Sequence, residues 1–217
     1  MTTPPSDEPA WKQRAVERSI KTAKLRAAQR VQRFLDAAQA IIIEKGSTDF
    51  TVQEVVDRSR QSLRSFYLQF DGKHELLLAL FEDALSRSAD QIRAATAGQR
   101  DPIDQVKVAV QLLFESSRPD PTARRPLFTD FAPRLLVSHP SEVRAAHEPL
   151  VALLTELMEE AATAGALRPG VNPRRMAAVT MQTVIFVAQS SGSDDASAKP
   201  ITADEVWDFC AHGFAAI

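Results

Sequence analysis

Apolar residues recur every three or four positions along most of the chain, which is the period of a helix that buries one face. The first such run, residues 11–45, contains no proline or glycine, and Gly46 follows it as glycine commonly follows a helix end. No pair of segments has the alternation of paired strands, so the pattern predicts an all-α fold. Pro133 is expected to kink or break the helix that contains it. The further helices are expected at residues 51–59, 63–68, from about 72, 102–116, 125–138, 141–164, 172–190 and 202–214.

Capping residues mark the starts of three of these helices. Thr51 is followed by Glu54 three residues later, which is a capping box, where each side chain accepts a hydrogen bond from the other residue's backbone N–H. Ser62 and Asp71 each precede a further helix, and both residue types accept bonds from the free N–H groups of a first turn. We therefore expect three helices around one small core in this part of the chain.

Charge is unevenly distributed along a chain whose formal net charge is −2. Residues 1–75 carry 13 basic and 10 acidic residues, against 13 and 18 in the remainder. Within them, residues 10–33 hold eight basic residues and one acid, Glu17. A polyanion is therefore expected to meet the N-terminal part of the chain. The eight basic residues are Lys12, Arg14, Arg18, Lys21, Lys24, Arg26, Arg30 and Arg33.

Composition argues against a secreted or membrane protein. The single cysteine, Cys210, cannot form an intramolecular disulfide, and it is expected to be a small buried residue. No stretch has the charged start, apolar middle and small-residue cleavage site of a signal peptide. The longest apolar runs fall short of the roughly 20 residues that a membrane helix needs. We expect a cytoplasmic protein with no membrane partner.

The residues that carry catalytic chemistry show no recognisable pattern. The histidines lack metal-ligand spacing, and the carboxylates show no pairing that would serve acid–base catalysis. The sequence therefore predicts a protein that is not an enzyme and has no metal site and no cofactor. The histidines concerned are His74, His139, His147 and His212.

Two short helices separated by a few residues, the second behind a serine cap, have the layout of a helix-turn-helix, whose second helix lies in the DNA major groove. The segment that starts at Thr51 reads TVQEVVDRSRQSLRSFYLQFDGKHELL, and it resembles the DNA-binding signature of the tetracycline-repressor (TetR) family. The resemblance implies a dimeric transcription factor that binds an operator in double-stranded DNA. It is specific over residues 31–75 and rests on Thr51, Val52, Val55, Ser62, Phe66, Tyr67, Phe70, Lys73, Glu75 and Leu76.

The resemblance implies three regions. Residues 1–29 are a basic, partly disordered N-terminal arm, residues 30–76 the helix-turn-helix domain, and residues 77–217 a helical ligand-binding and dimerisation domain. The sequence departs from the family where Arg60 and Gln61 replace a usual turn glycine and apolar residue. A left-handed Arg60 costs ~1–2 kcal/mol relative to glycine.

Side chains of the second helix are expected to reach DNA bases. Arg64 suits guanine, Gln61 adenine and Leu63 a thymine methyl group, and each good bidentate contact discriminates between bases by ~1–3 kcal/mol. Phe66 and Phe70 are expected to pack inward instead. The predicted DNA-binding residues are Thr51, Gln61, Ser62, Leu63, Arg64, Ser65, Tyr67, Lys73, Arg26 and Arg30.

Some of these residues have a second interpretation. Tyr67 either contacts a phosphate or covers the small core with its ring. Lys73 lies in the first turn of the following helix, where its charge attracts phosphate, and the resemblance implies the same role. The basic arm is expected to contact nucleic acid, and the alternative is a solvated helix.

The C-terminal region is expected to bind a ligand and a second copy of the chain. The resemblance implies an apolar pocket for a hydrophobic small molecule, such as a fatty-acyl or other lipid-like molecule, although most of its residues are core by default. It also implies a dimer contact that is a four-helix bundle of the helices at 172–190 and 202–214. The predicted lining residues are Phe114, Leu127, Phe128, Phe131, Leu135, Leu154, Met181 and Phe186, and the predicted dimer faces hold Met176, Val179, Thr183, Phe186, Val206, Phe209 and Phe214.

The mechanism expected from this layout is ligand-relieved repression. Ligand binding moves the helix after Gly72, so that the two recognition helices of the dimer lose the spacing that a palindromic site requires. One alternative is a helical lipid-binding or small-molecule-binding protein, or an enzyme, that never touches DNA. A second alternative is an activator or a ligand-free regulator. Salt-dependent DNA binding separates the first alternative from a regulator.

Overall fold

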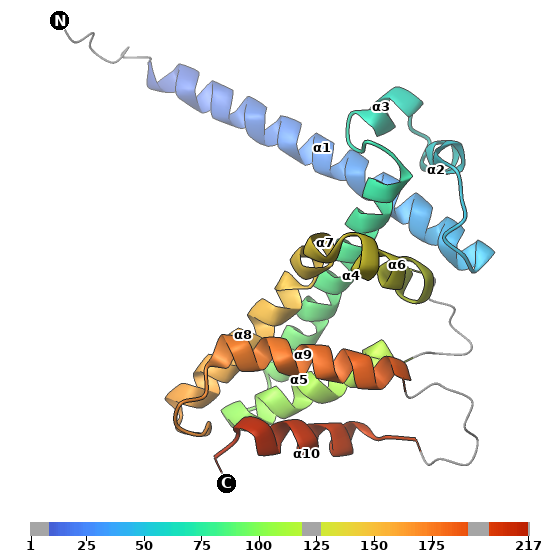
Figure 1. Ribbon diagram of the computed structural model, residues 1–217. Helices are drawn as coiled ribbons and strands as arrows, with labels where there is room; N and C mark the ends of the chain where they lie inside the picture. Colours follow the sequence, from blue (N-terminus) through green and yellow to red (C-terminus); the bar gives the residue numbers. More distant parts are fainter. Residues whose placement is uncertain (1–8, 119–126, 191–199, 217) are drawn as a thin grey trace, which may run out of the picture. The chain divides into compact units, whose positions relative to one another are not determined.

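The computed structural model describes residues 9–118, 127–190 and 200–216 (Figure 1). Within these ranges there is no strand, and the pairing of Leu167 with Ala215 is an isolated bridge. The predicted all-α fold is confirmed. None of the helices in these ranges has the length and apolar character needed to cross a membrane. The helices are α1 (Ala10–Lys45), α2 (Val52–Ser59), α3 (Leu63–Tyr67), α4 (Lys73–Thr96), α5 (Pro102–Ser117), the π-helix η1 (Leu127–Phe131), α6 (Ala132–Ser138), α7 (Pro140–Ala146), α8 (Glu148–Thr163), α9 (Pro173–Ser190) and α10 (Ala203–Phe214).

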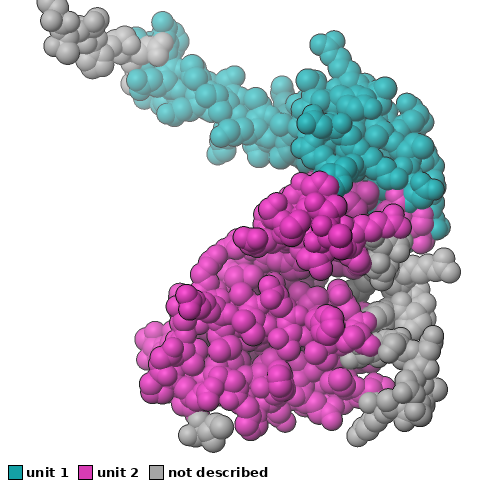
Figure 2. Space-filling model, in the orientation of Figure 1, with its two compact units in different colours: residues 1–45, 49–76 teal, residues 46–48, 77–217 magenta. Residues whose placement is uncertain are grey.

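The chain divides into two compact units (Figure 2). Unit 1 comprises residues 1–45 and 49–76, and unit 2 comprises residues 46–48 and 77–217. Helix α4 begins in unit 1 and continues in unit 2, so the two units share one continuous helix.

Unit 1 is built on the C-terminal half of α1. The apolar period of this stretch buries Phe34, Ala38 and Ile41 on one face, where α1 packs on α2 and Phe34 contacts Phe66 of α3. The helix ends at Gly46, whose φ of 59° is a left-handed conformation that glycine adopts without the penalty of a side chain. This end agrees with the prediction.

The N-terminal part of α1, residues 10–30, is called the arm below. It is helical, and its described side chains are exposed from Trp11 to Arg26. Large apolar side chains there, including Val16 and Ile20, are more than half exposed, so this stretch does not share in the core of unit 1. Residues 1–8 of the predicted, partly disordered region 1–29 lie outside the described residues.

Unit 2 has one core, formed mainly where α5, α8 and α9 pack on one another and α10 packs on α5 and α9. Leu113 of α5, Met158 of α8 and Val184 of α9 are almost fully buried there. Cys210 of α10 is buried as predicted, and burial raises the pKa of its thiol to about 11. The core therefore draws on every long helix that follows α4.

The structure corrects one predicted helix. The single helix expected at 141–164 is two helices, α7 and α8, which meet at His147. Pro149 explains the break, because proline has no N–H to donate and its ring clashes with the carbonyl group four residues earlier. Pro133 has the expected effect, since the π-helix η1 ends and α6 begins just before it.

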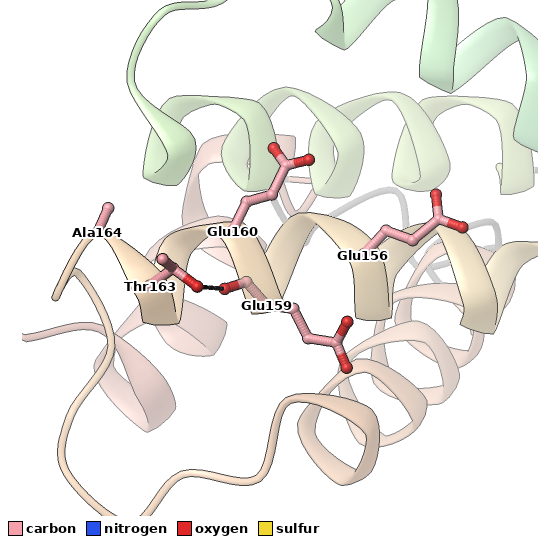
Figure 3. Close-up of a pocket in the computed structure, with 5 residues that line it drawn as sticks. All are labelled: Glu156, Glu159, Glu160, Thr163 and Ala164. Atoms are coloured by element: carbon pink, nitrogen blue, oxygen red, sulfur yellow. Dashed lines mark hydrogen bonds between the residues drawn. The ribbon is translucent and has the colours of Figure 1, made fainter.

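Open hollows on the described surface of unit 2 include one at α8 and one at α9. Figure 3 shows the residues that line the first, which are three glutamates on the C-terminal half of α8 with Thr163 and Ala164 at its end. The second lies before and along the start of α9, between Arg168 and Val179. Charged side chains line both hollows, including Arg168 and Arg175 in the second. The glutamates are Glu156, Glu159 and Glu160.

Candidate nucleic-acid interface

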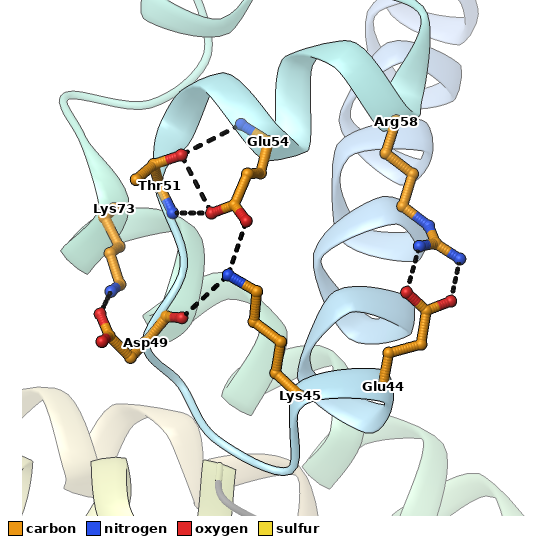
Figure 4. A network of polar contacts seen from close by, with 7 residues as sticks. All are labelled: Glu44, Lys45, Asp49, Thr51, Glu54, Arg58 and Lys73. Carbon is orange, nitrogen blue, oxygen red and sulfur yellow. Dashed lines mark hydrogen bonds and ion pairs between the residues drawn. The ribbon is translucent and has the colours of Figure 1, made fainter.

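The start of α2 is fixed by the predicted capping box (Figure 4). The Thr51 hydroxyl accepts a bond from the Glu54 N–H at 3.2 Å, and the Glu54 carboxylate accepts one from the Thr51 N–H at 2.7 Å. The Lys45 ammonium donates to the same carboxylate at 2.6 Å. These bonds, that of Lys45 foremost, lower the pKa of Glu54 to about 2. The end of α1 and the start of α2 are therefore held together by one carboxylate.

Two further cations of unit 1 are engaged by acidic partners (Figure 4). The Arg58 guanidinium makes two bonds of 2.6 Å to the Glu44 carboxylate, which lower the pKa of that carboxyl group. The Lys73 ammonium lies 3.8 Å from an Asp49 oxygen and 4.8 Å from the centre of the Phe50 ring. Lys73, predicted to contact phosphate, thus has protein partners in this structure.

Helix α3 has five residues and is anchored by its buried side. The Phe66 ring packs edge-on against Phe34 of α1, with ring centres 5.4 Å apart, and lies at the same distance from Phe70. Both Phe66 and Phe70 are buried, as predicted. The Ser62 hydroxyl accepts a bond from the Ser65 N–H at 3.1 Å, so the predicted cap is also confirmed.

Other side chains of α3 are open to solvent. Leu63, Arg64 and Tyr67 are exposed there, and Leu68 follows them. The Tyr67 ring lies edge-on to Phe66 at 5.4 Å while more than half of its surface stays exposed, so it covers the core and remains accessible. Within the described residues the Arg64 side chain has no ion-pair partner. This surface can therefore offer apolar contact, a hydroxyl group and a free guanidinium to DNA.

The structure brings together most of the predicted DNA-binding residues, and two groups stand apart. Residues 61–67 form α3 and the two positions before it, whereas the Thr51 hydroxyl is hydrogen-bonded to Glu54. Arg26 and Arg30 lie one turn apart on the exposed arm. The predicted DNA-binding residues did not include Arg60, whose only signal in the sequence is that it replaces the usual turn glycine. Arg60 lies between α2 and α3 and has a left-handed backbone.

The predicted ligand-lining residues all belong to unit 2. Most of them lie in the core or pack against it, and neither surface hollow is lined by any of them. Phe186 differs from the others, because the residue is 72% exposed. Of the predicted dimer faces, Val206 and Phe214 do not fit, because both are buried within the chain's own core. The fully buried members are Phe114, Leu135, Leu154 and Met181, and the partly buried ones are Leu127, Phe128 and Phe131.

A small helical unit with a helix-turn-helix, followed by a larger helical unit, is the architecture of a helical DNA-binding regulator. Residues 34–80 match the family model of "Bacterial regulatory proteins, tetR family". The uncharacterized HTH-type transcriptional regulator YvdT of Bacillus subtilis (strain 168) is 31% identical over 70 residues, which are 32% of this chain and 36% of that protein. The chain thus matches about a third of the length of this curated relative. The N-terminal part of the chain is thus similar to the DNA-binding domain of tetR-family regulators, and the resemblance seen in its sequence is confirmed.

Solved structures of similar fold extend over both units. The fatty acid degradation regulator FadR from Bacillus halodurans has a TM-score of 0.62 at 19% identity, covering 83% of this chain and 93% of its own. FadR from Thermus thermophilus, in complex with lauroyl-CoA, has a TM-score of 0.64 at 21% identity, covering 84% and 91%. FadR from Bacillus subtilis, in complex with stearoyl-CoA, has a TM-score of 0.60 at 14% identity, covering 84% and 98%. These similarities establish the shared fold.

The Glu54 carboxylate should make stability depend on acid pH. Its pKa lies at about 2 in the folded chain against an ordinary value of 4.5, so its stabilising effect is complete above pH 4.5 and is lost as pH falls towards 2. Between pH 5 and pH 2 the free energy of unfolding should therefore fall more steeply for the unaltered chain than for Glu54→Gln. Urea titrations across this range measure the difference. Glu159→Gln, an exposed carboxylate of α8, is the control, and equal pH profiles for Glu54→Gln and the unaltered chain would contradict the prediction.

Arg64 and Lys73 should differ in how they affect DNA binding. Arg64→Ala is expected to weaken specific binding by ~1–3 kcal/mol and to relax base preference at one position of each half-site. Lys73→Ala should weaken binding to all sequences nearly alike, because a phosphate contact carries no base identity. Binding to base-substituted duplexes distinguishes the two, with thermal melts to detect any loss of the Lys73–Asp49 contact. Equal losses on every duplex for Arg64→Ala would make Arg64 a phosphate contact.

Proposed function

We propose that the chain is a ligand-responsive DNA-binding transcriptional regulator without enzymatic activity, and that it acts as a repressor released from its operator by a hydrophobic small molecule. The observation that carries this proposal is the geometry of α3. Its buried Phe66 fixes the helix to α1, while Leu63, Arg64 and Tyr67 remain exposed. The family match at residues 34–80 covers all of these residues.

A homodimer through α9 and α10 is part of the proposal. Phe186 of α9 and Phe209 of α10 are each 72% exposed, and Val179 of α9 is more than half exposed. Large apolar side chains left in water favour association, because covering them removes apolar surface from solvent. Two copies that pair through these helices would carry two recognition helices, which doubles the number of base pairs that are read.

Helix α4 is the proposed link between ligand and DNA. It starts with Lys73 in unit 1, and its middle belongs to unit 2. Phe81 of α4 is buried there, with ring centres 5.5 Å from Phe128 and from His147. A ligand that repacks this core would displace α4, and thereby the first turn of α4 beside the helix-turn-helix. Ligand and DNA would then oppose each other by thermodynamic linkage.

A fatty-acyl thioester is the ligand class that we propose. The candidate lining residues, such as Phe114, Phe128 and Leu154, are apolar and carry no charge to pair with a polar ligand. Two regulators of similar fold bind lauroyl-CoA and stearoyl-CoA, as reported above. Because these residues are packed together in the structure, entry of an acyl chain would require them to separate.

Acyl-CoA should therefore release the protein from DNA. We expect lauroyl-CoA to lower the fluorescence anisotropy of a labelled duplex that the protein has bound, because binding to unit 2 disfavours the DNA-binding arrangement. Coenzyme A alone is the control, since it lacks the apolar chain. Identical titrations with the thioester and with coenzyme A would remove the acyl ligand from the proposal.

Charge placed on the proposed dimer face should produce monomers. Phe186→Glu and Phe209→Glu are each expected to shift the molecular mass from that of a dimer to that of a monomer, because the bundle would have to bury an unpaired carboxylate. Light scattering measures the mass at micromolar concentration. Val137→Glu, at an exposed apolar position of α6, is the matched control and should remain a dimer. A monomeric unaltered chain, whether alone or with DNA, would contradict the proposed architecture.

The arm should add affinity that does not depend on DNA sequence. Seven basic residues lie between Ala10 and Arg30, and each phosphate they neutralise should add ~0.9 to the magnitude of the slope of log affinity against log salt concentration. A chain that starts near Arg30 should therefore show a slope flatter by a few units, with unchanged base preference. Its melting temperature should be retained, because the core begins near Phe34. An unchanged slope would make the arm a solvated helix, and no duplex binding by the full chain would refute the proposed function.

A further inference from the structure

The turn between α2 and α3 is closed by a residue in an unfavourable conformation. Arg60 has φ 54° and ψ 38°, and among the described residues it is the only one other than glycine with a positive φ. Its N–H donates to the Asp57 carbonyl at 3.3 Å, and the Gln61 N–H donates to the Val56 carbonyl at 3.2 Å. This is the pattern of a Schellman motif, whose left-handed position is usually occupied by glycine. At this position the Cβ of arginine lies too close to the following carbonyl oxygen, and glycine has no Cβ.

Among the described residues, no contact of the Arg60 side chain explains its left-handed backbone. The side chain is exposed, and in the part of unit 1 that the structure describes it has neither an ion pair nor a hydrogen bond. Its neighbours differ, because Arg58 is bound to Glu44 and Lys45 to Glu54. The backbone at Arg60 therefore carries a steric penalty that its own side chain does not offset within the fold. Strained conformations of this kind cluster at functional sites.

The location of Arg60 indicates which function this is. The residue lies two positions before the Ser62 cap and four before Arg64, at the entrance to the helix proposed to read bases. Backbone phosphates flank the major groove on both sides, and Arg60 lies outside α3, in the turn before its cap, where a long side chain can reach them. Guanidinium also suits phosphate better than ammonium does, because its planar fork can bond two phosphate oxygens at once.

We propose that Arg60 is a phosphate-binding residue, which binds the DNA backbone at the edge of the groove that α3 enters. The assignment rests on the proposed DNA-binding function and deepens it. Arg64 then reads bases from within the helix, and Arg60 sets the position of that helix on the duplex. The chain retains a strained turn because a glycine at this position would lack the contact.

The experiment compares Arg60→Gly, Arg60→Asn and Arg60→Lys in the full chain. Glycine and asparagine both tolerate the left-handed backbone and remove the charge, whereas lysine keeps the charge and the strain. Arg100→Gly, which removes an exposed charge of unit 2, is the control. Each protein is titrated over a range of salt concentrations with a duplex that it selects from a random pool, and with a scrambled duplex of the same composition. Thermal melts accompany each titration.

The expected results separate a DNA contact from a structural role. Arg60→Gly should melt at the same temperature as the unaltered chain or higher, and it should lose affinity for both duplexes by a similar factor. The slope of log affinity against log salt should flatten by ~0.9 for each protomer bound. Arg60→Asn should show the same flatter slope, while Arg60→Lys and Arg100→Gly should keep the original slope.

Three results would overturn the assignment. An unchanged affinity and slope for Arg60→Gly would show that Arg60 does not touch DNA. A loss of affinity accompanied by a lower melting temperature in both Arg60→Gly and Arg60→Asn would make Arg60 a structural residue. A loss confined to the selected duplex would make it a base-reading residue. If the unaltered chain binds neither duplex, the proposed function itself fails, and the assignment of Arg60 fails with it.

Discussion

The contact between Phe34 of α1 and Phe66 of α3 is the interaction on which the candidate DNA-binding surface depends. A helix of five residues has too few hydrogen bonds to persist by itself, so α3 exists because its buried face is held. Phe70 completes the cluster, with ring centres 6.2 Å from Phe34 and 5.4 Å from Phe66. Once Phe66 points inward, the helical geometry turns Arg64, two positions earlier, away from the core. The packing of Phe66 in the core therefore determines the orientation of the candidate DNA-binding surface.

The cations of unit 1 fall into two groups with different roles. Lys45 and Arg58 are bound to carboxylates and join α1 to α2, whereas Arg60 and Arg64 have no ion-pair partner within the described residues. Exposed ion pairs are individually weak, so the paired group contributes more to fixing the helix-turn-helix geometry than to overall stability. The unpaired group leaves positive charge available to a polyanion. This division explains how a chain with a slightly negative net charge can present a cationic surface to DNA.

The features that the sequence predicts correctly are those with local chemical causes. The capping box of Thr51 and Glu54 is complete within four residues, and the inward direction of Phe66 follows from its helical period. The spacing of apolar residues does not show which apolar side of a helix meets the chain's own core. Phe209 and Phe214, five residues apart on α10, were therefore both assigned to the dimer face, although Phe214 is buried and Phe209 is exposed. The partners of Lys73 were likewise unpredictable, because Asp49 and Phe50 reach it through the tertiary fold.

Selection and sequencing of the DNA bound by the purified full chain test the central claim most directly. If two copies present α3 to adjacent major grooves, the selected duplexes should share a two-fold symmetric site, whose half-sites lie about 10–10.5 base pairs apart or a multiple of that spacing. A pool that shows no enrichment, or that yields only a single unpaired half-site, would contradict the account.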